Sequence, residues 1–415
     1  MKIPRRTFLQ GGLGLGYGLL NWGMPASDLF NFTLQAAQAS PRAAGAGKIL
    51  IVVQLAGGND GLNMVVPFGD DAYYKARPVI AIKQKDVLQL NDKIGLHPSM
   101  TEMHKMFKDG HLAVVQGVGY PDPNRSHFRS IEIWQTAEPK KVKDTGWLGR
   151  YLDLTANEKS RSNSLFPAIN VDPILPKTFS AERVVVPSVD NINTFDFKAS
   201  GDRAAQIQTF NDIYKDFKLS RPYVQKLREI GMSTTKASDF MAQTVKKYKS
   251  TVEYPNNNFG KGMKFIAQLI LGGVDCQLYN ISLGGFDTHT NEQRQHDTLF
   301  RQLSQGVNAL FTDLAAVNLD KDVVVMTFSE FGRRVAENGS RGTDHGTAMP
   351  MLIAGPSVKG GLVGDHPSLS DLDSGDLKYK IDFRCVYATM LEKWLGAGSS
   401  KQVLGDKYDL LDFLV

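Results

Sequence analysis

Continuous runs of apolar, mostly β-branched residues are the first regular feature of this chain. Residues 48–56 read KILIVVQLA, and such a run favours a strand that is buried on both faces of a sheet. Similar runs predict four more strands, at 112–116, 276–283, 323–328 and 351–354. The first run ends in a Gly-Gly-Asn-Asp-Gly sequence, which predicts a sharp turn at the carboxyl end of that strand.

Segments with helical spacing separate these strands. They predict helices at 99–108, 126–136, 146–154, 259–271, 292–316 and 383–395. Strands that alternate with helices are typical of an α/β fold, with a largely parallel central sheet and helices on both faces. The polar stretch of about 155–255 predicts a helical insertion or cap on this sheet, so we expect residues 40–415 to form a single domain.

The first 39 residues have the pattern of an export signal. Arg5 and Arg6 precede an uncharged, glycine-rich stretch, and we expect cleavage after Ala39. Paired arginines before such a stretch are typical of a twin-arginine signal. A short membrane anchor is the alternative, but the glycines make a poor spanning helix. We therefore expect the twin-arginine translocase as a partner, a periplasmic or extracellular location, and no stable membrane anchor.

Composition excludes some classes of function. A net charge of +5 over 415 residues is weak, and no basic run with interleaved aromatic residues indicates a nucleic-acid partner. Cys276 and Cys385 are the only cysteines, too few for a structural zinc site. An exported location permits a disulfide between them, and two free thiols are the alternative. The chain contains no Gly-x-Ser-x-Gly, P-loop or His-Glu-x-x-His motif.

Carboxylate and imidazole side chains gather near the ends of the predicted strands. Six of them are candidate metal ligands: Asp60, Asp287, His289, Glu330, Asp344 and His345. Sites in open α/β sheets form beyond the carboxyl ends of the strands, and crowded carboxylates repel one another unless cations lie among them. This mixture of ligands favours one or two divalent ions, zinc or manganese. Each residue taken alone has an ordinary alternative as a turn residue, a cap or an ion-pair partner.

The segment around Ser126 carries candidate catalytic residues. Ser126 stands at the expected start of a helix, between Arg125 and His127, with Arg129 one turn further on. A helix N-terminus attracts anions, and a metal can activate a serine hydroxyl. Ser126 is therefore a candidate nucleophile, with a simple helix cap as the alternative. His127 is a candidate for proton transfer, and Arg125, Arg129 and Arg333 are candidates for anion binding, with structural ion pairs as their alternative.

Five motifs resemble those of the DUF1501 family, a group of bacterial proteins exported by the twin-arginine route. They are AGGNDGLNMVVPF, RSHFRSIEIWQTA, GGFDTHTNEQRQH, TFSEFGRR and GTDHGTAMPMLIAGP, and they span nearly the whole expected mature chain. The family in turn resembles the alkaline phosphatase and sulfatase superfamily, and its GTDH segment is similar to that of phosphopentomutases.

The resemblance implies an alkaline-phosphatase-like fold with two metal ions beside a nucleophile. It implies that Asp60 is the ligand after the first strand and that Ser126 is the nucleophile. It also implies that Asp287 and His289 form an aspartate–histidine pair, and that His345 is a further ligand.

The chain also departs from the pattern of that superfamily. Where the superfamily usually has Asp-His, this chain has Ser329-Glu330, so one imidazole is missing. The spacing of the earlier aspartate and histidine is shorter than usual. His296 is the available replacement, as a ligand, a supporting donor or only a helix-surface residue.

The function implied by the resemblance is hydrolysis of a phosphate or sulfate ester. A metal-activated Ser126 would attack the ester, and water would cleave the covalent product. The alternative is a non-catalytic, metal-containing binding or assembly protein on the same fold.

Overall fold

The computed structural model describes residues 47–156, 166–189, 240–248 and 250–415, with single positions at 45, 205, 208, 209 and 212. The predicted signal, including Arg5, Arg6 and Ala39, lies outside the described residues, as does much of the predicted insertion. Over the described ranges, no helix is both long enough and apolar enough to cross a membrane.

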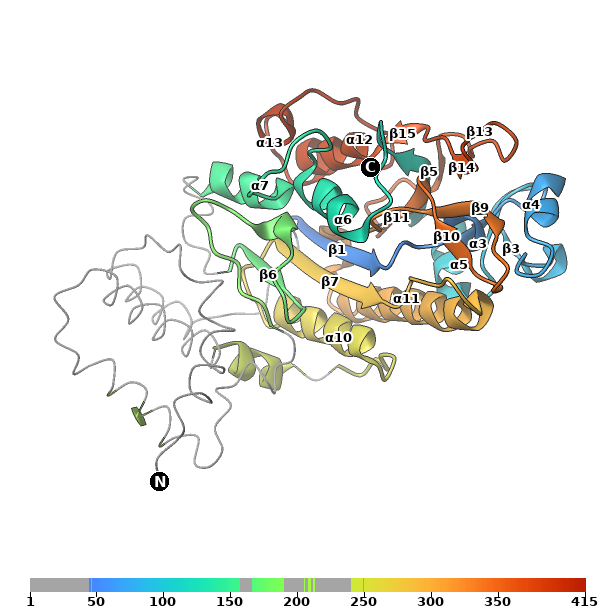
Figure 1. Ribbon diagram of the computed structural model, residues 1–415. Helices are drawn as coiled ribbons and strands as arrows, with labels where there is room; N and C mark the ends of the chain where they lie inside the picture. Colours follow the sequence, from blue (N-terminus) through green and yellow to red (C-terminus); the bar gives the residue numbers. More distant parts are fainter. Residues whose placement is uncertain are drawn as a thin grey trace.

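A mixed sheet forms the centre of the described residues (Figure 1). Its strands lie in the order β12 (Gly361–Val363), β5 (Leu112–Gly119), β11 (Met349–Ala354), β8 (Val323–Phe328), β1 (Ile49–Ala56), β7 (Leu278–Gly284) and β6 (Ala168–Asn170), and β15 (Ile381–Asp382) pairs with β5. All five predicted strands are present, and their bounds differ from the prediction by no more than a few residues.

The prediction of a largely parallel sheet is confirmed, with one exception. β1 runs parallel to β7 and β8, and β5 runs parallel to β12. β11, however, is antiparallel to both of its neighbours, β5 and β8. It therefore begins at the edge where the parallel strands end, and the residues just before it lie at that edge.

Helices cover both faces of the sheet, as predicted (Figure 1). One face carries α5 (Thr101–Lys108), α10 (Asn258–Leu271) and α11 (Glu292–Ala315). The other carries α6 (His127–Thr136), α7 (Trp147–Thr155), α12 (Phe383–Thr389) and the π-helical turn η4 (Met390–Trp394). The remaining short elements are α3 (Gly61–Met64), β2 (Val65–Val66), α4 (Asp71–Ala76), η1 (Gln84–Asp86), β3 (Leu88–Gln89), β4 (Gly95–Leu96), η2 (Lys177–Phe179), η3 (Asp320–Asp322), β9 (Arg333–Glu337), β10 (Thr343–His345), β13 (Leu372–Asp373), β14 (Asp376–Leu377) and α13 (Lys401–Leu404).

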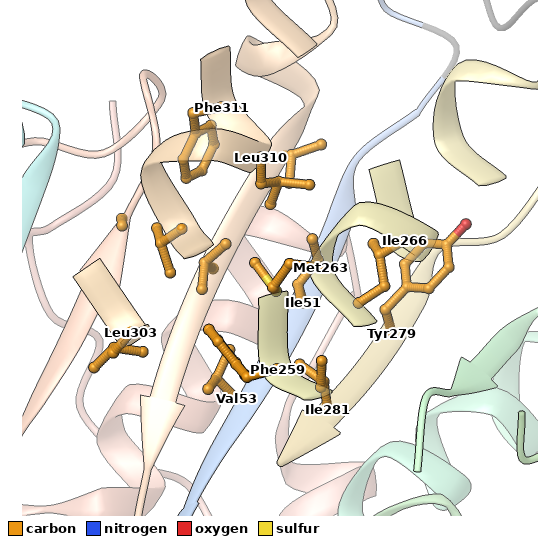
Figure 2. Close-up of a cluster of buried hydrophobic side chains, with 14 of the residues drawn as sticks. Ile51, Val53, Phe259, Met263, Ile266, Tyr279, Ile281, Leu303, Leu310 and Phe311 are labelled. Carbon is orange, nitrogen blue, oxygen red and sulfur yellow. The ribbon is translucent and has the colours of Figure 1, made fainter. Parts of the chain in front are cut away.

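The side chains of β1 alternate between two hydrophobic cores. Ile51 and Val53 lie in the core under α10 and α11, shown in Figure 2 with Met263. Leu50 and Val52 lie in the core on the opposite face. Each fully buried side chain of this size contributes about 1.5–3 kcal/mol, which explains why a continuous apolar run becomes a central strand.

The two cysteines do not form a disulfide. Cys276 is buried and Cys385 is partly exposed. Of the two alternatives raised by the sequence, the structure has two thiols without a disulfide between them.

The loops after β1 and β7 touch through their backbones at Gly57. Its φ is +123°, and a Cβ added there would lie 2.4 Å from the backbone nitrogen of Asp287. The nitrogen of Phe286 also donates to the carbonyl oxygen of Ala56 at 3.1 Å. Only a glycine permits this approach without strain, so Gly57 helps to set the position of Asp287.

Candidate metal centre

The predicted ligands meet at the carboxyl edge of the parallel strands. Asp287 and His289 follow β7, and His345 ends β10, shortly before β11. His127 begins α6, immediately after Ser126. The reversed direction of β11 brings His345 to this edge, because the residues before an antiparallel strand lie where its neighbours end.

Asp287, His289 and His345 bring three donor atoms close together. Nε2 of His289 lies 3.0 Å from Nε2 of His345. Oδ1 of Asp287 lies 3.1 Å from the first nitrogen and 3.2 Å from the second. Nε2 of His127 approaches the other carboxylate oxygen of Asp287, at 3.5 Å. We call these four residues the ligand group.

The opposite nitrogen of each imidazole faces a hydrogen-bond acceptor. Nδ1 of His127 lies 2.8 Å from Oε1 of Glu330, and Nδ1 of His289 lies 3.0 Å from Oδ1 of Asp344. Nδ1 of His345 lies 2.9 Å from the carbonyl oxygen of Arg125. In a neutral imidazole one nitrogen donates and the other accepts. These contacts therefore place the proton on Nδ1 and leave each Nε2 with a lone pair.

The ligand group fits a divalent cation. The carboxylate of Asp287 faces all three imidazoles, and ligand atoms of His127, Asp287 and His345 all lie within 4.8 Å of one another. Such crowding is repulsive unless a cation lies among the groups. Two donor atoms bound tetrahedrally at about 2.05 Å from one ion lie about 3.3 Å apart, close to the spacing in this group. Acceptors behind the imidazoles are typical of metal-binding histidines. The residues thus suit zinc or manganese, and His127, Asp287, His289 and His345 would hold the ion.

Two of the predicted ligands occupy supporting positions. The carboxylate of Glu330 is buried and accepts hydrogen bonds from His127 and from the backbone nitrogen of Gly57, the latter at 2.9 Å. Asp344 accepts from His289 and from Asn338. In this arrangement both carboxylates orient histidines of the ligand group.

His127 lies among the candidate ligands. The sequence predicts it as a group for proton transfer, and the centroid of its ring lies 4.5 Å from that of His345 and 4.9 Å from that of Phe331. The sequence signal for this position is weak, because a helix start rather than a strand end places the ring.

Arg333 is buried and connects the loops of the site. Its side chain donates to four backbone carbonyl groups, those of Gly57, Gly58, Phe286 and Thr343. It also donates to Oδ1 of Asp287 at 2.7 Å. Burial alone would raise the pKa of Asp287, but the hydrogen bond and the charge of Arg333 hold it below its usual value. The sequence predicted that Arg333 binds an anion, with a structural ion pair as the alternative. The side-chain donors of Arg333 are directed at the backbone carbonyl groups of these loops and at Asp287.

The other two candidate anion-binding arginines are also engaged within the protein. Arg129 donates to Glu132 and to the carbonyl oxygens of Pro139 and Lys141. Arg125 forms an ion pair with the buried carboxylate of Asp376. The carbonyl oxygen of Arg125 also accepts from His345 of the ligand group.

The hydroxyl of Ser126 is not used as a helix cap. Ser126 occupies the N-cap position of α6, and its side chain makes no capping hydrogen bond. Its backbone nitrogen instead donates to Oδ1 of Asn124 at 2.8 Å, and the residue is exposed. The structural alternative raised for Ser126, a simple cap, is therefore not what its side chain does.

Asp60 lies in a second, fully buried group with Glu292 and His296. One ligand atom of each lies within 4.8 Å of the others. Both carboxylate oxygens of Asp60 are bound by the buried guanidinium of Arg77, at 2.5 and 2.9 Å. Burial would raise the pKa of Asp60, but the charge and hydrogen bonds of Arg77 lower it to about 2. Asp60, predicted as a metal ligand, is thus the ion-pair partner of an arginine and lies outside the ligand group.

A proton completes the charge balance of this buried group. Burial, and then the charge of Asp60, raise the pKa of Glu292 to about 9, so Glu292 is a neutral acid at neutral pH. Burial lowers the pKa of His296 to about 3, so its imidazole is neutral as well. With one carboxylate and one guanidinium, the group is neutral without a metal.

Glu292 also supports the ligand group. Its Oε2 accepts hydrogen bonds from the hydroxyl of Thr343 at 2.5 Å and from that of Thr288 at 3.1 Å. Thr288 lies between Asp287 and His289, and Thr343 lies two residues before His345. The sequence marks Glu292 only as a helix start, so its role in joining these two loops was not predicted.

The chain belongs to the DUF1501 family, described as proteins of unknown function, whose model matches residues 47–396. No curated protein matches the chain. Among solved structures, the chain is similar to a protein of the alkaline phosphatase superfamily and to a sulfatase, at low sequence identity.

Three solved structures illustrate this similarity. A protein of the alkaline phosphatase superfamily from Vibrio parahaemolyticus is 9% identical, with a TM-score of 0.38 over 93% of this chain and 79% of that one. The PsFucS1 sulfatase from Pseudoalteromonas sp. is 12% identical, with a TM-score of 0.38 over 95% and 72%. The C-terminal periplasmic domain of EcEptC from Escherichia coli is 12% identical, with a TM-score of 0.34 over 85% and 84%.

We expect the ligand group to hold one divalent ion per chain. His345→Ala and Asp287→Ala should each lose most of the bound metal, because each removes a donor atom, and Glu330→Gln should weaken binding about 10–100-fold by releasing His127. Elemental analysis of the purified chain, with titration against a competing chelator, measures both effects. His104→Ala is the matched control and should retain the ion, because the ring of His104 lies against the carbonyl oxygen of Gln89, at 2.9 Å. Full metal content in His345→Ala would contradict this assignment.

We expect the stability of the chain to fall as pH rises from 6.5 to 8.5, through Glu292. The folded chain holds a proton on Glu292 up to about pH 9, whereas the unfolded chain releases it near pH 4.5. The free energy of unfolding therefore decreases with pH, by at most about 1.4 kcal/mol per unit from this group. Asp60 and His296 have lowered pKa values in the folded chain. Their ionisation raises the free energy of unfolding as pH rises, but only below about pH 6.5.

Glu292→Gln should flatten this dependence, since the amide stays neutral at every pH. Urea denaturation at pH 6.5, 7.5 and 8.5 tests it, with a chelator present so that metal binding adds no pH dependence of its own. The exposed Glu253→Gln is the control and should keep the wild-type slope. An unchanged slope in Glu292→Gln would show that Glu292 is ionised in the folded chain.

Proposed function

We propose that this member of the DUF1501 family is an exported, metal-dependent hydrolase of a phosphate or sulfate ester, with Ser126 as its nucleophile. The observation that carries the proposal is the position of Ser126 in the chain. Both of its neighbours are fixed to the ligand group, His127 by its ring and Arg125 by its carbonyl oxygen on His345. The exposed Ser126 therefore lies in the chain between two residues that contact the ligand group.

The surroundings of Ser126 suit an anionic ester. The first N–H groups of α6 and the positive end of its dipole favour a negative charge at this point. A bound divalent ion would supply Lewis-acid polarisation of the ester and lower the pKa of a nearby hydroxyl. In the proposed reaction Oγ of Ser126 attacks the phosphorus or sulfur, and the bond to the leaving alcohol breaks. Water then cleaves the serine ester and releases phosphate or sulfate.

One observation favours a second candidate, a non-catalytic binding or assembly protein that contains a metal. Arg129 and Arg333 are engaged in the fold, and Arg125 is paired with Asp376. An enzyme for anionic esters usually directs a guanidinium group at the anion. A protein that retained the metal without turnover would not need one.

Export by the twin-arginine route belongs to the same proposal and is supported by the sequence of residues 1–39. Because this route carries folded proteins, a metal acquired in the cytoplasm would remain bound during export. Arg5→Lys with Arg6→Lys should leave the chain in the cytoplasm, because the receptor reads the arginine pair. Cell fractionation measures the distribution. Equal amounts of the variant and the wild-type chain outside the cytoplasm would contradict this route.

We expect Ser126→Ala to abolish turnover and to keep the metal. With phenyl phosphate and phenyl sulfate as substrates, the rate should fall at least about a thousandfold, as for other lost nucleophiles. Ser399→Ala, an exposed serine near the C-terminus, is the matched control. Metal content measured on the same samples separates the two candidate functions. A metal-loaded wild-type chain without turnover on a broad panel of esters supports the binding protein, and turnover unchanged in Ser126→Ala rejects this nucleophile.

A further inference from the structure

A cavity of about 450 Å³ lies between three segments at the same edge of the sheet. One segment is the loop between β5 and α6, with Asp122 and Asn124. The second is the hairpin of β9 and β10 with the residues that flank it, including Phe331 and Thr347. The third is the hairpin of β13 and β14 with its continuation, including Asp373 and Tyr379. Its volume is in the range of small-molecule sites.

The cavity adjoins the ligand group and Ser126. The ring of Phe331 forms part of its wall and packs against His127 and His345, with centroids 4.9 and 4.5 Å apart. Asn124, also in the wall, accepts the hydrogen bond of the Ser126 nitrogen. The cavity thus meets Ser126 through Asn124 and the ligand group through Phe331.

The charged groups of the cavity wall are mainly negative. Asp122 and Asp373 are exposed carboxylates. Lys378 is the one lysine or arginine among the described lining residues, and its charge is balanced by an ion pair with Asp371. The charge of Asp122 reaches the ring of Tyr379, whose pKa is raised by burial and by nearby carboxylates including Asp122. The wall thus offers hydrogen-bond acceptors and aromatic carbon, and it repels a further anion.

From this wall we infer the class of alcohol that the proposed hydrolase releases: a leaving group that carries hydroxyl or ammonium hydrogen-bond donors and no negative charge of its own. The inference rests on the proposed function. Hydroxyl or ammonium groups would donate to Asp122 and Asp373, and the carbon skeleton would lie against Tyr379 and Phe331. Esters whose alcohol carries a carboxylate or a second phosphate are disfavoured by these two aspartates.

Matched pairs of ligands test the inference, because they differ mainly in the charge of the leaving group. Glycerol 3-phosphate is compared with 3-phosphoglycerate, and ethanolamine phosphate with phosphoglycolate, by calorimetric titration of the zinc- or manganese-loaded chain. In each pair the ligand without the carboxylate should bind at least about tenfold more tightly. In Asp122→Asn with Asp373→Asn the ratio should fall to within about threefold, whereas Asp406→Asn, an exposed carboxylate outside the wall, should keep the wild-type ratio. Circular dichroism and the two single variants exclude misfolding as the cause.

Each outcome decides the inference. Tighter binding of glycerol 3-phosphate than of ethanolamine phosphate identifies hydroxyl donors, and the reverse order identifies an ammonium group. Equal or tighter binding of the carboxylate ligands, a ratio that the double variant leaves unchanged, or no detectable binding of any ligand overturns it. Phenyl phosphate turnover, measured on the same samples, separates the two proposals. Turnover without the preference rejects the leaving-group class alone, and the preference without turnover rejects the hydrolase alone.

Discussion

The burial of Arg333 is the constraint on which the rest of the site depends. A guanidinium without access to water must have each donor satisfied and its charge compensated. Four carbonyl groups from three loops provide the acceptors, and Asp287 provides the charge. Asp287 is half exposed, so its carboxylate faces the buried cation on one side and the histidines on the other. The same contact therefore stabilises the fold and positions the central carboxylate of the ligand group.

The second buried arginine explains why the two acidic groups differ in their chemistry. Arg77 neutralises Asp60, and a proton neutralises Glu292, so a divalent ion among these buried residues would leave excess positive charge out of reach of water. The ligand group lies nearer to solvent, with three imidazoles around the carboxylate of Asp287 and no arginine bound to both of its oxygens, and there a cation removes repulsion. The two groups still act on each other, because the hydroxyls of Thr288 and Thr343 connect Glu292 to the loops that carry the ligands.

The sequence predicted those features that follow from local pattern. The apolar run of β1 is a central strand because its alternate side chains fill two cores, and polar residues after buried strands gather at one edge in any parallel sheet. The direction of β11 was not predictable in this way, because an apolar run has the same pattern in either direction. The pairing of Asp60 with Arg77 was also missed, since nothing near either residue distinguishes a buried guanidinium from an exposed one. For Arg333 the sequence offered anion binding or a structural ion pair, and the ion pair with Asp287 is present; its contacts with carbonyl groups could not be predicted, because only the tertiary fold assembles them.

The position of Ser126 shows how these constraints combine. A serine at an N-cap ordinarily accepts a hydrogen bond from the first turn and contributes about 1 kcal/mol to stability, yet here the hydroxyl makes no such bond. The neighbours of Ser126 fix the backbone instead, His127 through Glu330 and Asp287, and Arg125 through His345 and Asp376. A cap that binds the helix would turn the hydroxyl away from solvent. Because the ligand group already holds this end of α6 in place, the helix can begin here without the cap, and the exposed Ser126 stands next to the ligand group in the chain.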